Sequence, residues 1–351
     1  MNTKRKMQLQ CPMPKLDFDV ITLGHGSGGV LTNRLLDQVV LHLLQNDVLD
    51  TRHDGAVLEM QGKQAFTTDS FVVSPVFFPG GNIGDLAVNG TVNDLAMCGA
   101  IPQYLSLSFI LEEGLPMERF WDILVSVKAA CETAGVQVVT GDTKVVEKGK
   151  GDQVFINTSG IGRMHPQAQI HASRIQPGDK IIVSGPVATH GTAIMALREG
   201  LEFDTTIESD SQSLQHLTLA LLDKYGADVH LFRDPTRGGL GTVLTEIARD
   251  TKLGMEVEQA DLPLQQQVSA LCEILGLDPL YVANEGIFAA IVAGDAAEAM
   301  VATLRELPGG EAAAIIGQVV EDHPGKAILR SGIGGRRVIN MLVGEQLPRI
   351  C

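Results

Sequence analysis

The alternating strand and helix patterns of this 351-residue chain stop once, between His165 and Gly178. Pro166 and Pro177 stand in this segment, and no apolar periodicity runs through it. Patterned sequence resumes on its far side, so the segment predicts a boundary between two domains, each with its own core. The expected division is an N-terminal extension (1–22), an N-terminal domain (23–165), a C-terminal domain (166–338) and a mobile C-terminal tail (339–351).

A predicted hairpin decides the fold class. Ala56–Met60 and Gln64–Val73 alternate as strands do, and a Gln61-Gly62-Lys63 turn joins them. Because a hairpin pairs its strands antiparallel, the sheets cannot be purely parallel. Amphipathic runs predict helices over 30–45 and 116–134. We therefore expect two α+β domains with mixed or antiparallel sheets and packed helices.

Composition excludes several classes of partner. The formal net charge of -15 argues against nucleic-acid binding and against anionic membranes, because both need a basic surface. The five cysteines are scattered and form no Cys-x-x-Cys pair, which fits a reducing compartment better than a disulfide framework or a zinc site. No signal peptide and no apolar run of membrane-spanning length is present, so a cytoplasmic location is expected.

A glycine-rich loop is the first candidate for ligand binding. It formally satisfies Gly-x-Gly-x-x-Gly, and Asp47 and Asp50 stand near the spacing of a dinucleotide fingerprint. That fingerprint needs a parallel βαβ unit, whereas a hairpin is predicted next, so we interpret the loop as a backbone-amide cradle for phosphate. A flexible glycine turn is the alternative. No Walker A motif occurs. The loop consists of Gly24, His25, Gly26, Ser27, Gly28 and Gly29.

Four aspartates stand among small polar residues near predicted strand ends. Carboxylates in such settings suit Mg²⁺, a hard cation that prefers oxygen ligands and bridges to nucleotide phosphates. Each one alone is more often a turn or cap residue than a ligand. The four are Asp69, Asp94, Asp142 and Asp234.

Two further residues are candidate proton carriers. Lys144 follows Gly141-Asp142-Thr143, and Glu285 stands in Ala283-Asn284-Glu285-Gly286, within a predicted apolar strand over 281–293. A carboxylate in an apolar strand has either a partner or a shifted pKa, and both are common at active sites. The alternative is a structural ion pair.

The chain ends on a thiol. Cys351 follows Pro348-Arg349-Ile350, and a cysteine at a mobile end can move between sites and partners. Prenylation is excluded, because that signal places its cysteine four residues from the end. The alternative is an end residue without a role.

Taken together, these segments resemble the HypE family, the carbamoyl dehydratases of [NiFe]-hydrogenase maturation. The resemblance begins near Leu23 and continues to the end, and Pro235 is a departure where a small residue is commoner. The matching segments are His25–Gly29, Thr67–Ser70, Phe77–Gly84, Phe109–Pro116, Thr140–Val146, Arg233–Gly239, Ala283–Gly286 and Pro348–Cys351.

The resemblance implies a PurM-like fold, shared with aminoimidazole ribonucleotide synthetase and selenophosphate synthetase, and a homodimer formed through the N-terminal domain. It also implies a reaction: HypF carbamoylates the terminal cysteine, and ATP-dependent dehydration converts the product to a thiocyanate. Cyanide then passes to iron held by HypC and HypD.

On this reading, ATP and Mg²⁺ are the expected cofactors. We expect catalysis from Cys351, Lys144 and Glu285, and Mg²⁺ binding by Asp69, Asp94 and Asp142. Nucleotide binding is expected from these three aspartates together with Gly26, Ser27, Gly28, Gly29, Thr143 and Asp234.

Three alternatives remain at the level of sequence. A kinase or synthetase of the same fold, acting on a free small molecule, leaves the terminal cysteine unexplained. A scaffold carrying iron or partners through Cys351 leaves the aspartates and the glycine loop without a role. A nicotinamide site at the glycine loop is the third.

Overall fold

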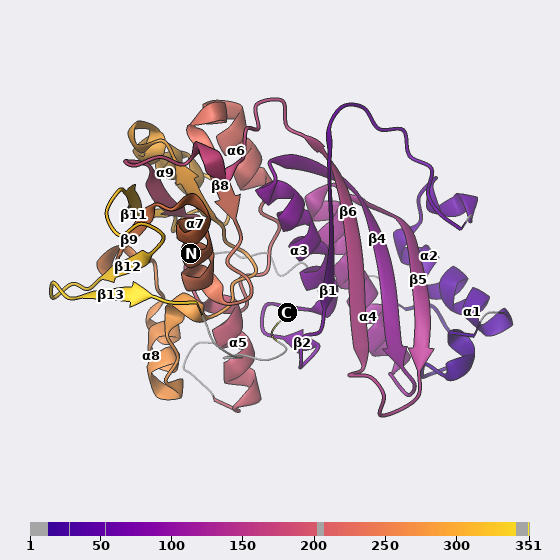
Figure 1. The fold of residues 1–351 in the computed structure, drawn as a ribbon. Coiled ribbons are helices and arrows are strands. Elements are labelled where there is room, and N and C mark those ends of the chain that lie inside the picture. The colour runs from indigo at the N-terminus through magenta and orange to yellow at the C-terminus, as the bar shows by residue number, and fades with distance from the viewer. Residues whose placement is uncertain (1–12, 28, 53, 202–206, 342–349, 351) are drawn as a thin grey trace.

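The computed structural model describes two domains side by side (Figure 1). The expected boundary at 165–166 falls between two sheets, one built from residues 64–164 and the other from residues 180–339. The described residues are 13–27, 29–52, 54–201, 207–341 and 350.

The first sheet has four strands in the order β1-β6-β4-β5. Only β4 and β5 run parallel, and the other pairs are antiparallel. Side chains alternate between buried and less buried along β4, as expected of a sheet with one covered face. The strands are β1 (Gln64–Phe71), β4 (Ala100–Glu112), β5 (Gln137–Val146) and β6 (Val154–Met164).

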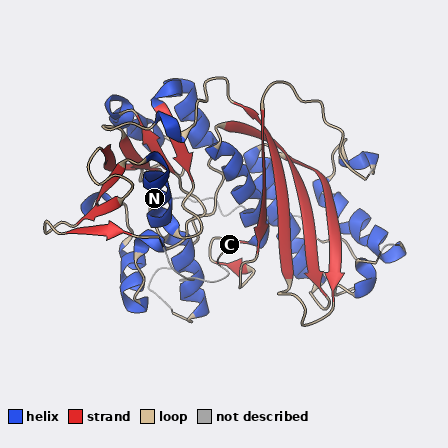
Figure 2. Ribbon diagram, in the orientation of Figure 1, coloured by secondary structure: helices blue, strands red, loops and turns tan. Residues whose placement is uncertain are grey.

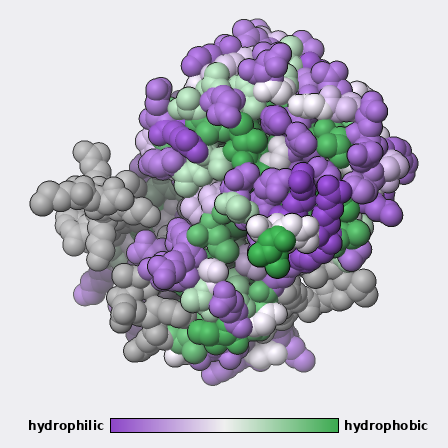
Figure 3. All heavy atoms as spheres, turned by 90° about the vertical axis from the view of Figure 1, so that its left-hand side faces the viewer, coloured by the Kyte–Doolittle hydropathy of each residue, from purple (hydrophilic) through white to green (hydrophobic). Residues whose placement is uncertain are grey.

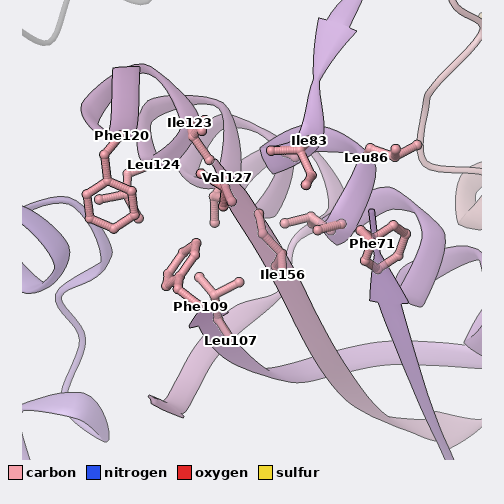
Figure 4. Packing of buried hydrophobic residues seen from close by; sticks show 14 of the residues in the cluster. Phe71, Ile83, Leu86, Leu107, Phe109, Phe120, Ile123, Leu124, Val127 and Ile156 are labelled. Carbon is pink, nitrogen blue, oxygen red and sulfur yellow. The ribbon is translucent and has the colours of Figure 1, made fainter. Parts of the chain in front are cut away.

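Two long helices cover one face of this sheet, α3 (Ile83–Met97) and α4 (Met117–Ala134). Figure 4 shows large side chains of both helices and of the strands meeting in the core between them, among them Phe71, Phe109 and Phe120, all fully buried. In Figure 1 the strands lie in front of these helices. Shorter helical segments stand beyond β5: α1 (Val30–Leu35), a π-helical turn (Leu36–Val40) and α2 (Leu41–Leu44).

The predicted hairpin is wrong. Residues 56–60 form no strand, and β1 pairs along its whole length with β6, from Gln64 opposite Arg163 to Phe71 opposite Ile156. The Gly62 turn exists, with a φ of 77°, but the segment before it stays at the surface, where Val57 is 93% exposed. Pairing with β6, about ninety residues away, places β1 in the four-stranded sheet, where Phe71 is buried in the apolar core.

The second sheet has seven strands in the order β13-β12-β9-β11-β7-β10-β8, with only β9 and β12 parallel. Helices pack around it, as Figure 2 shows in blue. Its strands are β7 (Lys180–Val183), β8 (Val229–Arg233), β9 (Gly254–Glu258), β10 (Ala289–Val292), β11 (Ala314–Val320), β12 (Ala327–Arg330) and β13 (Arg336–Ile339). Its helices are α5 (Thr189–Arg198), α6 (Gln215–Tyr225), α7 (Gly239–Thr251), α8 (Gln266–Leu275) and α9 (Ala297–Arg305).

The two domains share apolar packing at their junction. Ile194 and Ala283 of the C-terminal domain belong to the core cluster of the N-terminal domain, and so does Ile350 near the chain end. A small two-stranded ribbon, β2 (Phe77–Phe78) with β3 (Gly81–Asn82), lies at this junction against α5. The face of the C-terminal domain in Figure 3 is largely hydrophilic with scattered apolar patches. In the described part of the chain, no helix is long and apolar enough to span a membrane.

Candidate active site

A cavity of about 160 Å³ lies at the junction of the two domains and brings together four residues that the sequence singled out. Asp69 comes from β1 and Asp94 from α3, whereas Asp234 and Glu285 come from the C-terminal domain. The complete lining is Thr68, Asp69, Ser70, Phe71, Gly90, Asp94, Asp234, Thr236, Arg237 and Glu285. The cavity is therefore acidic, with Arg237 as the cation in its wall.

Asp94 lies on α3, and its carboxylate is hydrogen-bonded to a residue of β1. The Thr67 hydroxyl donates to Asp94 Oδ2 at 2.7 Å. Burial raises the pKa of the Asp94 carboxyl, the Thr67 hydrogen bond offsets part of this rise, and the negative charge of Asp69 adds to it. Two carboxylates that repel each other in a partly buried site favour a bound cation.

Asp234 follows β8 in a loop that leads into α7. Burial, and next the negative charge of Asp94, raise the pKa of Asp234 to about 6. In the same loop, Arg237 Nη2 donates to Asp69 Oδ1 at 3.2 Å, so an ion pair joins the domains across the cavity. Carboxyl groups with raised pKa values in a cleft are typical of functional sites.

Glu285 lies in a loop, and the predicted strand over 281–293 is too long, because β10 begins only at Ala289. The residue is 4% exposed, and its backbone N–H donates to Asp210 Oδ1 at 3.1 Å. Beside it, Asn284 fixes the loop: its Oδ1 accepts from the Ala188 N–H at 2.6 Å, and its Nδ2 donates to the Pro235 carbonyl at 2.9 Å. The backbone around Glu285 is thus rigidly held.

The remaining predicted residues gather at the other edge of the first sheet. Asp142, Thr143 and Lys144 lie on β5, whereas Asp69 lies on β1, with β6 and β4 between them. Lys144 Nζ donates to Asp142 Oδ1 at 2.6 Å, and this hydrogen bond lowers the pKa of Asp142. Within one chain, the structure does not bring these residues into the cavity at the domain junction.

The glycine loop packs on β5. A Cβ added at Gly26 would lie 2.5 Å from the backbone nitrogen of Val145, so only glycine fits there. Ser27 caps the loop internally, donating to the Gly24 carbonyl at 3.3 Å. A cavity of about 560 Å³ opens nearby between the α1–α2 segment and β5, and Asp142 and Thr143 are in its lining. Gly28 lies outside the described residues.

No metal cluster is preformed in the described part of the chain, because no three His, Cys, Asp or Glu side chains there are placed to hold an ion. The donor chemistry of Asp69 and Asp94 still suits Mg²⁺, which takes one or two carboxylates and completes its shell with water and phosphate oxygens.

Sequence reasoning missed two residues next to this site. His190 on α5 is fully buried, and its Nε2 lies 2.8 Å from the backbone oxygen of Ile350. Asp210 accepts the Glu285 N–H, and burial raises the pKa of Asp210 to about 6. Neither stands in a motif whose spacing signals a role, and only tertiary structure reveals their position. Cys351 lies outside the described residues.

Both domains of the chain match known proteins. Two family models match: AIR synthase related protein, N-terminal domain, over residues 52–164, and AIR synthase related protein, C-terminal domain, over residues 176–330. Carbamoyl dehydratase HypE of Azotobacter vinelandii is 48% identical over 342 residues, covering 97% of this chain and 100% of that protein.

The chain belongs to the HypE family. A crystal structure of HypE in complex with ATP superposes with a TM-score of 0.90 at 46% identity, covering 94% of this chain and 99% of that one. The crystal structure of a HypE–HypF complex gives a TM-score of 0.77 at 40% identity, covering 88% and 99%. The PurM-like α+β fold and the family expected from sequence are therefore confirmed.

Proposed function

We propose that this chain is an ATP-dependent carbamoyl dehydratase that converts an S-carbamoyl group on Cys351 to an S-cyano group for the iron of [NiFe]-hydrogenase. The observation that carries the proposal is the 48% identity with a carbamoyl dehydratase over 97% of the chain. The acidic cavity between the domains, which gathers four of the predicted residues, supports it.

The chemistry defines what the site must do. A carbamoyl oxygen is a poor leaving group, so ATP phosphorylates it and releases ADP. The nitrogen then gives up its two protons, the C–O bond breaks, and phosphate leaves. The products are the thiocyanate, ADP and phosphate. The protein must therefore bind the polyphosphate, orient the carbamoyl group and accept protons from nitrogen.

We assign these tasks to the predicted residues. Glu285 and Lys144 take or relay the nitrogen protons, and Cys351 carries the reacting group. The glycine loop (Gly26–Gly29) holds phosphate oxygens, as backbone N–H groups in glycine loops do, and Thr143 takes part in binding the nucleotide. Mg²⁺ supplies charge neutralisation when bound, and Asp69, Asp94 and Asp142 would hold it, while Asp234 supports the nucleotide side of the cavity.

A homodimer would bring the predicted residues on β5 close to those in the cavity at the domain junction. One face of the first sheet is covered by α3 and α4, whereas side chains on the other face are exposed, including Phe66 at 68% and Ile110 at 44%. Pairing of two such faces buries this apolar surface. It also lets the β5 edge of one protomer, with Asp142 and Lys144, approach the cavity of its partner.

The proposed partners follow from the reaction. HypF supplies the carbamoyl group, in keeping with the HypE–HypF complex of a relative, and the HypC–HypD complex accepts cyanide. These steps would take place in the cytoplasm.

Intact mass measurement tests the proposed function. After incubation with HypF, carbamoyl phosphate and MgATP, we expect one added carbamoyl group on Cys351, followed by loss of one water. Cys351→Ala should gain nothing while still binding ATP. Absence of any adduct with an active HypF would overturn the proposal and favour an ATP-dependent enzyme that acts on a free small molecule.

A further inference from the structure

Near its end, the chain is held at the junction of the two domains. The Ile350 side chain is 4% exposed and belongs to the apolar cluster of the N-terminal domain. Two residues of the C-terminal domain, Ile194 on α5 and Ala283 before Glu285, belong to the same cluster. The backbone oxygen of Ile350 lies 2.8 Å from His190 Nε2. One residue next to the terminal cysteine is thus recognised through both its side chain and its carbonyl.

Besides the Ile350 carbonyl, two contacts hold the His190 ring. Its Nδ1 lies 2.8 Å from Ser209 Oγ, and the edge-to-face contact with Phe78 of β2 has a centroid distance of 5.5 Å. The Ile350 carbonyl can only accept a hydrogen bond, so Nε2 of the neutral ring carries the hydrogen and donates to it. Nδ1 is then unprotonated and accepts from the Ser209 hydroxyl, whose oxygen accepts the Ser211 N–H at 3.1 Å. Burial lowers the pKa of His190 to about 4, which keeps the ring neutral at physiological pH.

The same framework holds Glu285. The Gly191 N–H donates to the Ala283 carbonyl at 3.0 Å, and Asp210, between Ser209 and Ser211, accepts the Glu285 N–H. No side chain fits at Gly286, where a Cβ would lie 1.7 Å from the Asp210 carbonyl oxygen. The imidazole that binds Ile350 and the carboxylate proposed as base are therefore parts of one rigid unit.

We propose that His190 is a positioning residue for the tail: it docks Ile350 at the domain junction and thereby presents the reacting cysteine to the cavity that contains Glu285. The inference rests on the proposed function for its catalytic part. Consecutive Cα atoms are about 3.8 Å apart, so a contact that fixes one residue limits the reach of a thiol carried on the next. Such restriction gives the tethered group a high effective concentration at the site.

Two substitutions separate the hydrogen bond from the packing. His190→Phe retains a ring at this buried position but has no donor, and His190→Gln restores an N–H donor. Ser209→Ala leaves the ring in place and removes the hydroxyl that donates to Nδ1. His216 is a matched control, because its Nε2 also lies 2.8 Å from a carbonyl, that of Pro308, on the exposed face of α6. His216→Phe should leave both the rate of carboxypeptidase trimming and the rate of dehydration unchanged.

Carboxypeptidase trimming, followed by intact mass, measures docking without requiring catalysis. A docked Ile350 must leave its pocket before digestion, so the trimming rate follows the undocked population. We expect His190→Phe to be trimmed about tenfold faster than the wild type, and Ser209→Ala several-fold faster, because a buried carbonyl loses its donor. An unchanged trimming rate in both variants would overturn the proposal.

Single-turnover dehydration of the carbamoylated protein tests the positioning role. We expect the rate in His190→Phe to fall about tenfold, with ATP affinity and the extent of carbamoylation unchanged and with recovery in His190→Gln. Faster trimming without a slower dehydration would show docking but overturn positioning. If the wild-type protein formed no thiocyanate, the proposed function itself would fail, and the positioning role with it, whereas the trimming result would still report docking.

Discussion

At the scale of the residue, the buried carboxyl group of Asp234 lowers the stability of the fold when it is ionised. Its pKa is raised to about 6, first by burial and then by Asp94, so the folded chain holds this proton more tightly than the unfolded chain. The stability contributed by the protonated form is present below the ordinary carboxyl pKa and is lost as pH rises towards about 6. At neutral pH the ionised carboxylate therefore destabilises the fold.

We accordingly expect Asp234→Asn to raise the melting temperature of the nucleotide-free protein. The rise should be roughly 2–6 °C at about pH 8 and smaller at about pH 5, where the wild-type carboxyl is mostly protonated. Nucleotide binding with Mg²⁺ should weaken in the same variant. Thermal melts at both pH values, with Asp250→Asn on the exposed end of α7 as control, check the prediction. An equal rise at both pH values would contradict it.

At the scale of the element, the sequence pattern correctly predicted the helix that depends on interactions between neighbouring residues. The expected helix over 116–134 agrees with α4 (Met117–Ala134), because helical periodicity and the proline at its start are properties of neighbouring residues. The hairpin at 56–73 failed because β1 pairs with β6, far along the chain. The strand around Glu285 failed for the same kind of reason: contacts with Asp210 and Pro235 hold that segment as a loop.

The candidate site also contains residues that sequence motifs predicted and residues that only the tertiary structure reveals. Motifs singled out Asp69, Asp94, Asp234 and Glu285, and the structure gathers them in one cavity. No pattern in the sequence reveals that Asp142 and Lys144 lie at the far edge of the sheet, since strand order depends on which distant strands pair. His190 and Asp210 escaped detection because their importance lies in their neighbours, which are remote in the chain.

The contact between the glycine loop and β5 gives a prediction at this scale. Gly26→Ala places a methyl group 2.5 Å from the Val145 nitrogen, so the loop must move off the strand. We expect ATP affinity to fall about tenfold, equivalent to 1.4 kcal/mol, when measured by calorimetric titration. Gly332→Ala, in the turn between β12 and β13, where nothing lies within 4 Å of the added Cβ, is the matched control and should bind normally. Normal ATP affinity in Gly26→Ala would remove the glycine loop from the nucleotide site.

At the scale of the whole molecule, the separation of the predicted residues has a consequence for catalysis in a dimer. If the β5 edge of one protomer completes the cavity of its partner, Lys144→Ala and Glu285→Gln damage different halves of each site. A mixed dimer of the two variants then contains one intact site and one site with both defects. Random reassortment of equal amounts should restore roughly a quarter of the wild-type thiocyanate formation, although each variant alone is inactive.

The matched control is a mixture of Glu285→Gln with Asp234→Asn. Both residues line the same cavity of one chain, so every cavity in the mixed dimer retains one defect, and no activity should return. Recovery only in the first mixture requires that Lys144 acts on the partner's Glu285. No recovery in either mixture, with reassortment verified by mass, would place Lys144 and Glu285 in the same chain's site. Lys144 on β5 would then have to approach Glu285 of its own C-terminal domain, so β5 would have to move relative to that domain.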